Sequence, residues 1–243
     1  MRELHIHRPL NDFPHLRNLT SLSFLAYSAA ETLRVLRECP LLEALSITVH
    51  GVRRCLEEIT LPFLRTLELG SYDTNRGLPK LTVPRLEQIS FVDLAQECIP
   101  RIKDLLARSS CKLNSIKLTC NELAPSQSLA DVLPNLPLAQ ELTLSYDAWA
   151  IEDLRLLRHC QAALSTVTRL NFEGYLELGD IDSGKFRSTL QSWAGSGDRD
   201  ASKRVVLRLG DSFVARGTGL VEELTKIEGL SVASEYLSGT KDP

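Results

Sequence analysis

Leu42-Glu-Ala-Leu45-Ser-Ile47 is the first of four short sequence motifs that share one spacing of apolar residues. The spacing recurs in Leu64-Arg-Thr-Leu67-Glu-Leu69, Leu86-Glu-Gln-Ile89-Ser-Phe91 and Leu113-Asn-Ser-Ile116-Lys-Leu118. The central residues stand at positions 45, 67, 89 and 116, so the intervals between copies are 22, 22 and 27 residues. A period of this length accommodates one strand and one return segment per copy. The series therefore predicts stacked strand-and-return units that share a continuous apolar core.

Looser copies extend the series toward both ends of the chain. The expected central positions are 4, 22, 45, 67, 89, 116, 142, 170, 207 and 230, of which the ninth, Leu207 followed by Leu209, lacks a clear leading apolar residue. About ten irregular copies predict an α/β leucine-rich-repeat solenoid with a curved parallel sheet on its concave side. Helices and irregular loops are expected on the convex side. We expect one solenoid domain over residues 1–243, with a surface loop near 195–203 and a short polar tail at 234–243.

The segments between copies give further expectations about secondary structure. Amphipathic patterns predict helices over Ala29 to Cys39, Ile99 to Arg108 and Ile151 to Cys160. The stretch from Gly70 to Val83 is rich in Gly, Pro and Asn and is expected to be irregular. Four prolines share a place five residues before the central residue of their copy: Pro40, Pro62, Pro84 and Pro137. There proline is expected to end the return segment and begin an extended stretch.

Composition excludes several broad classes of protein. The formal net charge is -3 for 28 basic and 31 acidic residues, which argues against general binding to nucleic acid or to anionic membranes. No apolar run reaches membrane-spanning length, and the first residues do not resemble a signal sequence. The six cysteines, at positions 39, 55, 98, 111, 120 and 160, include no Cys-x-x-Cys pair, so reduced thiols are expected. The expected location is intracellular, either cytoplasmic or nuclear.

Two patterns imitate catalytic or ligand-binding motifs. Gly179 to Lys185 matches the first seven positions of a phosphate-binding loop, but Phe186 replaces the hydroxyl residue that holds magnesium. Asp180 and Asp182 would repel phosphate within that loop. His5 and His7 would point the same way from a strand, yet a zinc site needs further ligands. We therefore expect no enzyme activity, no catalytic residues, no cofactor and no metal, and a nucleotide-binding enzyme is the weakest functional hypothesis.

The residues that flank each central position are expected to line the concave sheet, because side chains alternate along a strand. They are mostly short and polar, which suits a protein or peptide partner, although a merely solvated face is the alternative. The candidate partner-binding residues are Ser46, Thr48, Thr66, Glu68, Gln88, Ser90, Ser115, Lys117, Glu141, Thr143, Arg169, Asn171 and Glu173.

Aromatic residues follow several of the expected strands. Three of them, Tyr27, Tyr72 and Tyr175, stand where many leucine-rich repeats place an asparagine that bonds the turn backbone, and Tyr146 and Trp149 lie close to the equivalent place of their copy. Two interpretations stay open for this aromatic rim. The rings fill space inside the fold, or they form a binding hot spot, because Tyr and Trp contribute strongly to interface energies.

The phrase Cys39-Pro-Leu-Leu-Glu-Ala-Leu-Ser-Ile47, the irregular copies and the termini without disulfide caps resemble the repeat half of F-box proteins, particularly those of the large fungal sets. The resemblance covers nearly the whole chain. It implies that the repeats hold the substrate of a ubiquitin ligase. The F-box module itself, which docks a Skp-type adaptor in that family, is not expected here because the chain opens directly on a strand phrase. A Skp-type adaptor is therefore expected as a partner only if an F-box precedes Met1.

Two functional hypotheses follow from the recognition surface. The first is a protein–protein recognition module, the substrate-binding repeat region of an F-box-type ubiquitin ligase receptor. The second is a stand-alone leucine-rich-repeat scaffold, inhibitor or regulator without a role in ubiquitin transfer. Both place a protein partner on the concave face and expect neither nucleic acid nor membrane as a partner.

Overall fold

The computed structural model describes residues 3–6, 16–49, 56–70, 80–92, 99–120, 139–149, 167–176, 204–209 and 230–234. The chain divides into two units, Met1–Thr119 and Cys120–Pro243, and each unit is described by itself. The prediction of one domain over 1–243 stays a prediction. Several predicted features lie outside the described residues, namely the helix at 151–160, the phosphate-loop-like stretch at 179–186, the loop near 195–203, Pro137 and the tail beyond Ser234.

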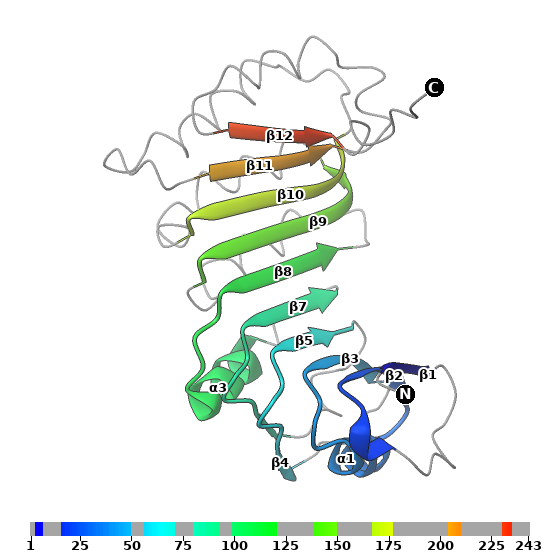
Figure 1. Ribbon diagram of the computed structural model, residues 1–243. Helices are drawn as coiled ribbons and strands as arrows, with labels where there is room; N and C mark the ends of the chain where they lie inside the picture. The colour runs from blue at the N-terminus through cyan, green and yellow to red at the C-terminus, as the bar shows by residue number, and fades with distance from the viewer. Residues whose placement is uncertain are drawn as a thin grey trace. The chain divides into compact units, whose positions relative to one another are not determined.

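Six parallel strands form the sheet of the first unit and are adjacent in chain order except where the short strand β4 or β6 intervenes (Figure 1). They are β1 (Glu3–Ile6), β2 (Ser21–Ala26), β3 (Ala44–Val49), β5 (Thr66–Leu69), β7 (Gln88–Val92) and β8 (Ser115–Cys120). Their pairing aligns one apolar residue of every strand in a single row: Leu4, Leu22, Leu45, Leu67, Ile89 and Ile116. The predicted parallel sheet is confirmed, and this row contains the predicted central residues.

Four parallel strands form the sheet of the second unit. They are β9 (Glu141–Trp149), β10 (Arg169–Leu176), β11 (Arg204–Leu209) and β12 (Leu230–Ser234). Leu142 pairs with Leu170, as the predicted central positions require, but Leu170 then pairs with Val205 and not with Leu207. The expected centre of the ninth copy was therefore wrong by two residues. A shift of two preserves the alternation of faces, so periodicity alone could not detect it.

Apolar side chains on one face of the first sheet make the core. In β2, half-buried residues alternate strictly with buried ones, as expected when one face of a strand is covered. Each of the four best copies buries its leading, central and third apolar residue, as Leu64, Leu67 and Leu69 illustrate. The spacing found in the sequence is therefore the spacing of buried positions.

The strands of the first unit begin with a repeated hydrogen-bond arrangement. The carbonyl oxygen of Glu43 accepts from the amides of Arg65 and Thr66, at 2.8 and 3.0 Å. The carbonyl oxygens of Thr20, Arg65 and Glu87 each accept from two consecutive amides of the next strand's start in the same way. In the second unit, the carbonyl oxygen of Gln140 accepts from the amides of Thr168 and Arg169 at the start of β10. This arrangement fixes the register of neighbouring strands at their N-terminal ends.

The prolines lie in tight turns just before the strands. The amides of Leu42, Leu64 and Leu86 donate to the carbonyl oxygen three residues earlier, at 3.4, 3.3 and 3.1 Å. Proline occupies the second position of each turn, at Pro40, Pro62 and Pro84, where its fixed φ suits a hydrogen-bonded turn. The sequence located these residues correctly, but they begin a turn and not the extended stretch that was predicted.

Two helices and a two-stranded sheet lie between the strands of the first unit in the chain. Helix α1 (Ala29–Glu38) and helix α3 (Ile99–Ser109) confirm two predicted helices to within one residue at each end. The hydroxyl of Ser28 caps α1 by accepting from the amide of Glu31 at 3.2 Å. A single 3-10 turn, η1 (Leu16–Asn18), precedes β2.

The two short strands are β4 (Glu58–Thr60) and β6 (Lys80–Thr82), which pair in parallel. Part of the stretch from Gly70 to Val83 is therefore a strand, where the sequence predicted irregular structure. Leu81 and Val83 are buried, and α3 packs against β6. Burial beneath the helix and pairing with β4 stabilise a strand that its Gly- and Pro-rich neighbourhood does not favour.

Candidate recognition surfaces

The first sheet leaves one face partly open to solvent, and we call it the polar face. Its two rows of side chains pair across the strands. One row runs through Ser21, Ala44, Thr66, Gln88 and Ser115, and the other through Ser23, Ser46, Glu68, Ser90 and Lys117. All ten residues are half-buried or exposed. Parallel sheets normally have both faces covered by helices, so a partly open parallel face is unusual.

Charge is sparse on the polar face. The hydroxyl of Ser46 donates to the carboxylate of Glu68 at 2.9 Å across the neighbouring strands β3 and β5. Lys117 is the other charged residue of the two rows, and it is half-buried. The remaining side chains are short hydroxyls, one amide and one alanine, which make a shallow surface that can donate and accept hydrogen bonds.

Thr48 also belongs to the predicted partner-binding set, and it is the last residue but one of β3. Its side chain is half-buried and occupies the space beside Gly70, where a Cβ atom on residue 70 would stand 2.9 Å from the Cβ of Thr48. The amide of Gly70 donates to the carbonyl of Ile47 at 2.9 Å, so the backbone is held against β3. Thr48 therefore packs against the chain itself at this position.

The second unit gathers four of the predicted residues into one hydrogen-bonded cluster. The amide nitrogen of Asn171 donates to Glu141 at 2.6 Å and to Thr143 at 3.0 Å, and Arg169 lies 3.5 Å from the Glu141 carboxylate. Thr143 is 6% exposed and Asn171 is 8% exposed. Their polar atoms satisfy one another, as buried polar groups usually do. These two residues are thus much less accessible than their counterparts in the first unit.

Only part of the predicted aromatic rim falls on side chains that the structure describes. Tyr27 is 53% exposed and follows β2 directly. Tyr146, Trp149 and Tyr175 lie in β9 and β10, where Tyr175 pairs with Ala148 beyond a shift in register and Trp149 pairs with Leu176. Glu173 pairs with Ser145 in the same strands. Tyr72 lies outside the described residues, so the two interpretations of the rim stay open.

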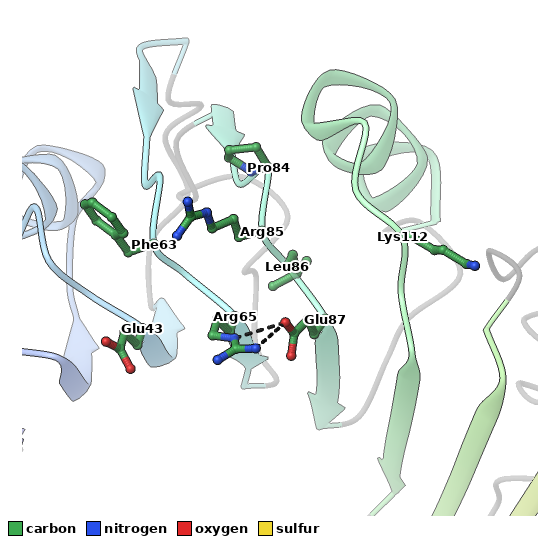
Figure 2. A pocket seen from close by; sticks show the side chains of 8 residues that line it. All are labelled: Glu43, Phe63, Arg65, Pro84, Arg85, Leu86, Glu87 and Lys112. Atoms are coloured by element: carbon green, nitrogen blue, oxygen red, sulfur yellow. Dashed lines mark hydrogen bonds and ion pairs between the residues drawn. The ribbon is translucent and has the colours of Figure 1, made fainter.

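A surface that the sequence analysis missed lies at the turns that precede β5, β7 and β8 (Figure 2). It is a hollow of about 520 Å³, and its wall consists of Glu43, Phe63, Arg65, Pro84, Arg85, Leu86, Glu87 and Lys112. The guanidinium carbon of Arg85 stands 5.5 Å from the centre of the Phe63 ring, a cation–π arrangement. Arg65 donates twice to one carboxylate oxygen of Glu87, at 3.0 and 2.6 Å.

Arg65 and Glu87 form a largely exposed ion pair at 2.6 Å in the wall of this hollow. The hydrogen bonds with Glu87, followed by its negative charge and more weakly that of Glu43, raise the pKa of Arg65 above its ordinary value. Figure 2 shows Arg65 facing Glu87, while Arg85 points toward Phe63. A sequence signal did exist for this surface, because Phe63, Arg85 and Lys112 each stand immediately before the leading leucine of their copy.

The described free thiols, Cys39 and Cys111, are buried and half-buried. Cys39 is a free, buried thiol, and burial together with the nearby charge of Glu38 raises its pKa to about 11. Burial likewise raises the pKa of Cys111. Within the described ranges, no group of three or more His, Cys, Asp or Glu side chains is placed to hold a metal ion. His5 lies in β1, whereas His7 is outside the described residues.

No helix in the described part of the chain combines the length and apolar character needed to cross a lipid bilayer. Comparisons with known proteins add no family assignment. No protein-family model, no curated protein and no solved structure matches the chain.

Proposed function

We propose that this chain is a protein–protein recognition module of the leucine-rich-repeat type and that its polar face holds a protein partner. The polar face is the observation that supports the proposal most directly. A parallel sheet with one apolar, buried face and one partly open face of short polar side chains is suited to contact with another protein. The regular spacing of the buried leucines and the repeated hydrogen bonds at the strand starts also favour stacked repeats.

The more specific form of the proposal is the substrate-binding repeat region of an F-box-type ubiquitin ligase receptor. It rests on the resemblance of the Pro-x-Leu phrases to those proteins. The second candidate is a stand-alone scaffold, inhibitor or regulator of the same repeat type. The hydrogen-bonding character of the polar face favours a protein partner in both cases, so the surface test below applies to either.

The first experiment tests whether the polar face binds. Ser90→Arg places a long cation near the middle of that face, whereas Ala107→Arg places the same side chain at an exposed position of α3. Tagged wild-type protein and both variants are cross-linked in cells of the native organism, purified, and analysed by quantitative mass spectrometry. We expect at least one protein to be depleted about ten-fold by Ser90→Arg and retained by Ala107→Arg.

A set of captured proteins that Ser90→Arg leaves unchanged would count against recognition through the polar face. Thermal unfolding of both variants serves as the control, since a general loss of structure would remove partners without reporting on the surface. The same purification, performed on the protein together with any sequence encoded upstream of Met1, separates the two candidates. Recovery of a Skp-type adaptor supports the ubiquitin ligase receptor, and its consistent loss from the purified material supports the stand-alone scaffold.

A further inference from the structure

The hollow beside β5 and β7 belongs to a longer strip of surface along the turns of the first unit. We call it the turn edge and define it by the residue that precedes the leading leucine of each copy: Leu41, Phe63, Arg85 and Lys112. These residues occupy equivalent places, because the turns that contain the first three share one hydrogen-bond arrangement and the strands that follow all four pair in register. The strip therefore changes along its length from apolar to cationic.

The apolar end of the turn edge is unusually exposed for this chain. Leu41 is 43% exposed and Phe63 is 41% exposed, and they are two of only four large apolar side chains exposed within the described ranges. Single exposed apolar residues are common on protein surfaces and need no explanation. Here the two follow one another on adjacent turns, and Phe63 also forms part of the wall of the hollow.

The cationic end of the turn edge carries charge that the described residues do not neutralise. Arg85 contacts the ring of Phe63 but forms no ion pair with any described residue, and neither does Lys112. Of the two carboxylates in the wall of the hollow, Glu43 and Glu87, that of Glu87 is bound by Arg65. This local excess of positive charge stands on a chain whose net charge is -3. A ligand that complements the strip needs negative charge beside an apolar group.

We propose that the turn edge is a second docking site, distinct from the polar face, for an acidic peptide segment of a partner protein. An apolar side chain of the segment would pack beside Phe63 and Leu41, and its carboxylates would lie near Arg85 and Lys112. Arg85 serves both parts of the site, because its guanidinium covers an aromatic ring and retains donors that fit a carboxylate. Aromatic and arginine residues are also enriched at protein interfaces.

The test uses the full chain and two fluorescein-labelled synthetic peptides in fluorescence anisotropy titrations at low ionic strength. The acidic probe is acetyl-Glu-Leu-Glu-Glu-Leu-Glu-Glu-Leu, and the control probe has glutamine in place of every glutamate. We expect the acidic probe to bind about ten-fold more tightly than its glutamine counterpart. The difference should shrink as salt is raised, because exposed charges are screened over about 10 Å at 0.1 M.

Variants locate the binding on the protein. The double variant Arg85→Glu/Lys112→Glu should weaken acidic-probe binding about ten-fold, given that each exposed ion pair is worth up to about five-fold in affinity. Phe63→Ser should also weaken it. Arg17→Glu, which reverses an exposed cation of η1, should leave it unchanged. Circular dichroism and thermal unfolding test whether each variant is folded. The single variant Lys112→Gln replaces any variant that does not fold.

Three outcomes would overturn the proposal. One is equal affinity for the two peptides, and another is an effect of Arg85→Glu/Lys112→Glu no larger than that of Arg17→Glu. The third is sedimentation equilibrium showing a wild-type dimer that Phe63→Ser dissociates, since the turn edge would then bind a second copy of the chain. None of these measurements involves the polar face, so a result against the turn edge does not count against the proposed function. In the same way, a negative result for Ser90→Arg does not count against the turn edge.

Discussion

Gly70 follows β5 and lies against the side chain of Thr48, the last residue but one of the neighbouring strand β3. A methyl group at residue 70 would stand 2.9 Å from the Cβ of Thr48 and closer still to its hydroxyl. Because the Cβ atom of Thr48 is fixed by the backbone, rotation of the side chain cannot remove the whole overlap. Glycine is therefore required here by close packing between two strands.

Gly70→Ala should consequently destabilise the protein by about 1–3 kcal/mol, the usual cost of inserting a methyl group into a packed site. Urea unfolding followed by circular dichroism measures the change. The matched comparison introduces Gly70→Ala into the variant Thr48→Gly, in which the colliding side chain is absent. In that background, Gly70→Ala should destabilise the protein less than it does in wild type. Equal stability of Gly70→Ala and wild type would show that the neighbouring strands can move apart freely.

The buried thiol of Cys39 should make the free energy of unfolding depend on pH in the alkaline range. Its pKa is raised to about 11, from an ordinary value of 9.0, by burial and by Glu38. The unfolded chain therefore loses this proton at lower pH than the folded chain does. The contribution of the neutral thiol is complete below pH 9 and declines as pH rises from 9 through 11.

Wild type should accordingly lose about 2–3 kcal/mol more stability than Cys39→Ala between pH 8 and pH 11, because a shift of one pKa unit corresponds to about 1.4 kcal/mol. Urea unfolding at pH 8, 9, 10 and 11 measures both proteins under the same conditions. Groups that titrate in both proteins, such as lysines and tyrosines, cancel in the difference. Parallel declines for the two proteins would exclude Cys39 as the cause.

At the scale of the element, α3 is fastened to β6 by its last residue. The hydroxyl of Ser109 is buried, donates to the carbonyl of Leu105 at 2.6 Å and accepts from the amide of Val83 at 2.9 Å. Arg108 adds a hydrogen bond to the carbonyl of Leu81 at 3.3 Å. Ser109 thus satisfies the amide of Val83, the residue that directly follows β6.

Ser109→Ala should cost about 1–3 kcal/mol, because it leaves the buried amide of Val83 without an acceptor. Ser115→Ala is the matched control, since Ser115 is half-buried on the polar face, and its effect should stay within about 0.5 kcal/mol. Thermal unfolding compares the two variants. Hydrogen exchange should also accelerate at Val83 in Ser109→Ala, and unchanged exchange there would argue against this role of the hydroxyl.

Ser110 directly follows α3 in a backbone conformation that suits glycine. Its φ is 49°, and its amide donates to the carbonyl of Leu106 at 3.0 Å. A left-handed residue with a Cβ atom carries a steric cost that glycine avoids. Ser110→Gly should therefore stabilise the protein by about 0.5–1 kcal/mol in thermal unfolding, whereas Ser110→Ala should bring no gain. Stabilisation by alanine would show that the hydroxyl, and not the backbone, causes the effect.

Elements were predictable where local patterns determine them. The amphipathic periodicity of Ala29 to Cys39 predicted α1, and the Leu-x-x-Leu-x-Leu phrases predicted strands with buried leucines. Strand β6 was missed because its burial depends on α3, more than fifteen residues later in the chain. The turns at Pro40, Pro62 and Pro84 were located but misread, since proline suits both a turn and an extended stretch.

At the scale of the whole molecule, periodicity predicted which residues face the core but not what covers the other face. Ser46 and Asn171 occupy comparable places in the pattern, yet only Asn171 is buried. The turn edge was also missed, because Phe63 and Arg85 become neighbours only when successive turns are aligned. Sequence alternation identifies the face of a side chain, whereas its accessibility depends on segments far away in the chain.

Stacked repeats would give the first unit a distinctive pattern of stability. In a stack, each layer is stabilised mainly by its immediate neighbours, whereas a single cooperative core opens as one block. Leu67 is fully buried in β5, between Leu45 of β3 and Ile89 of β7. Removing most of its side chain leaves a cavity in one layer, so the response of the other strands reports how the layers are coupled.

Leu67→Ala should lower overall stability by about 2–5 kcal/mol, the range observed for leucine truncation in cores. Hydrogen exchange measured by mass spectrometry should then show the largest loss of protection in β3, β5 and β7 and a smaller loss in β2 and β8. Thr66→Ala, a half-buried neighbour on the polar face, serves as the control and should leave the pattern close to that of wild type. An equal loss of protection in all five strands would indicate one cooperative block and would remove the physical basis for treating this unit as a stack of repeats.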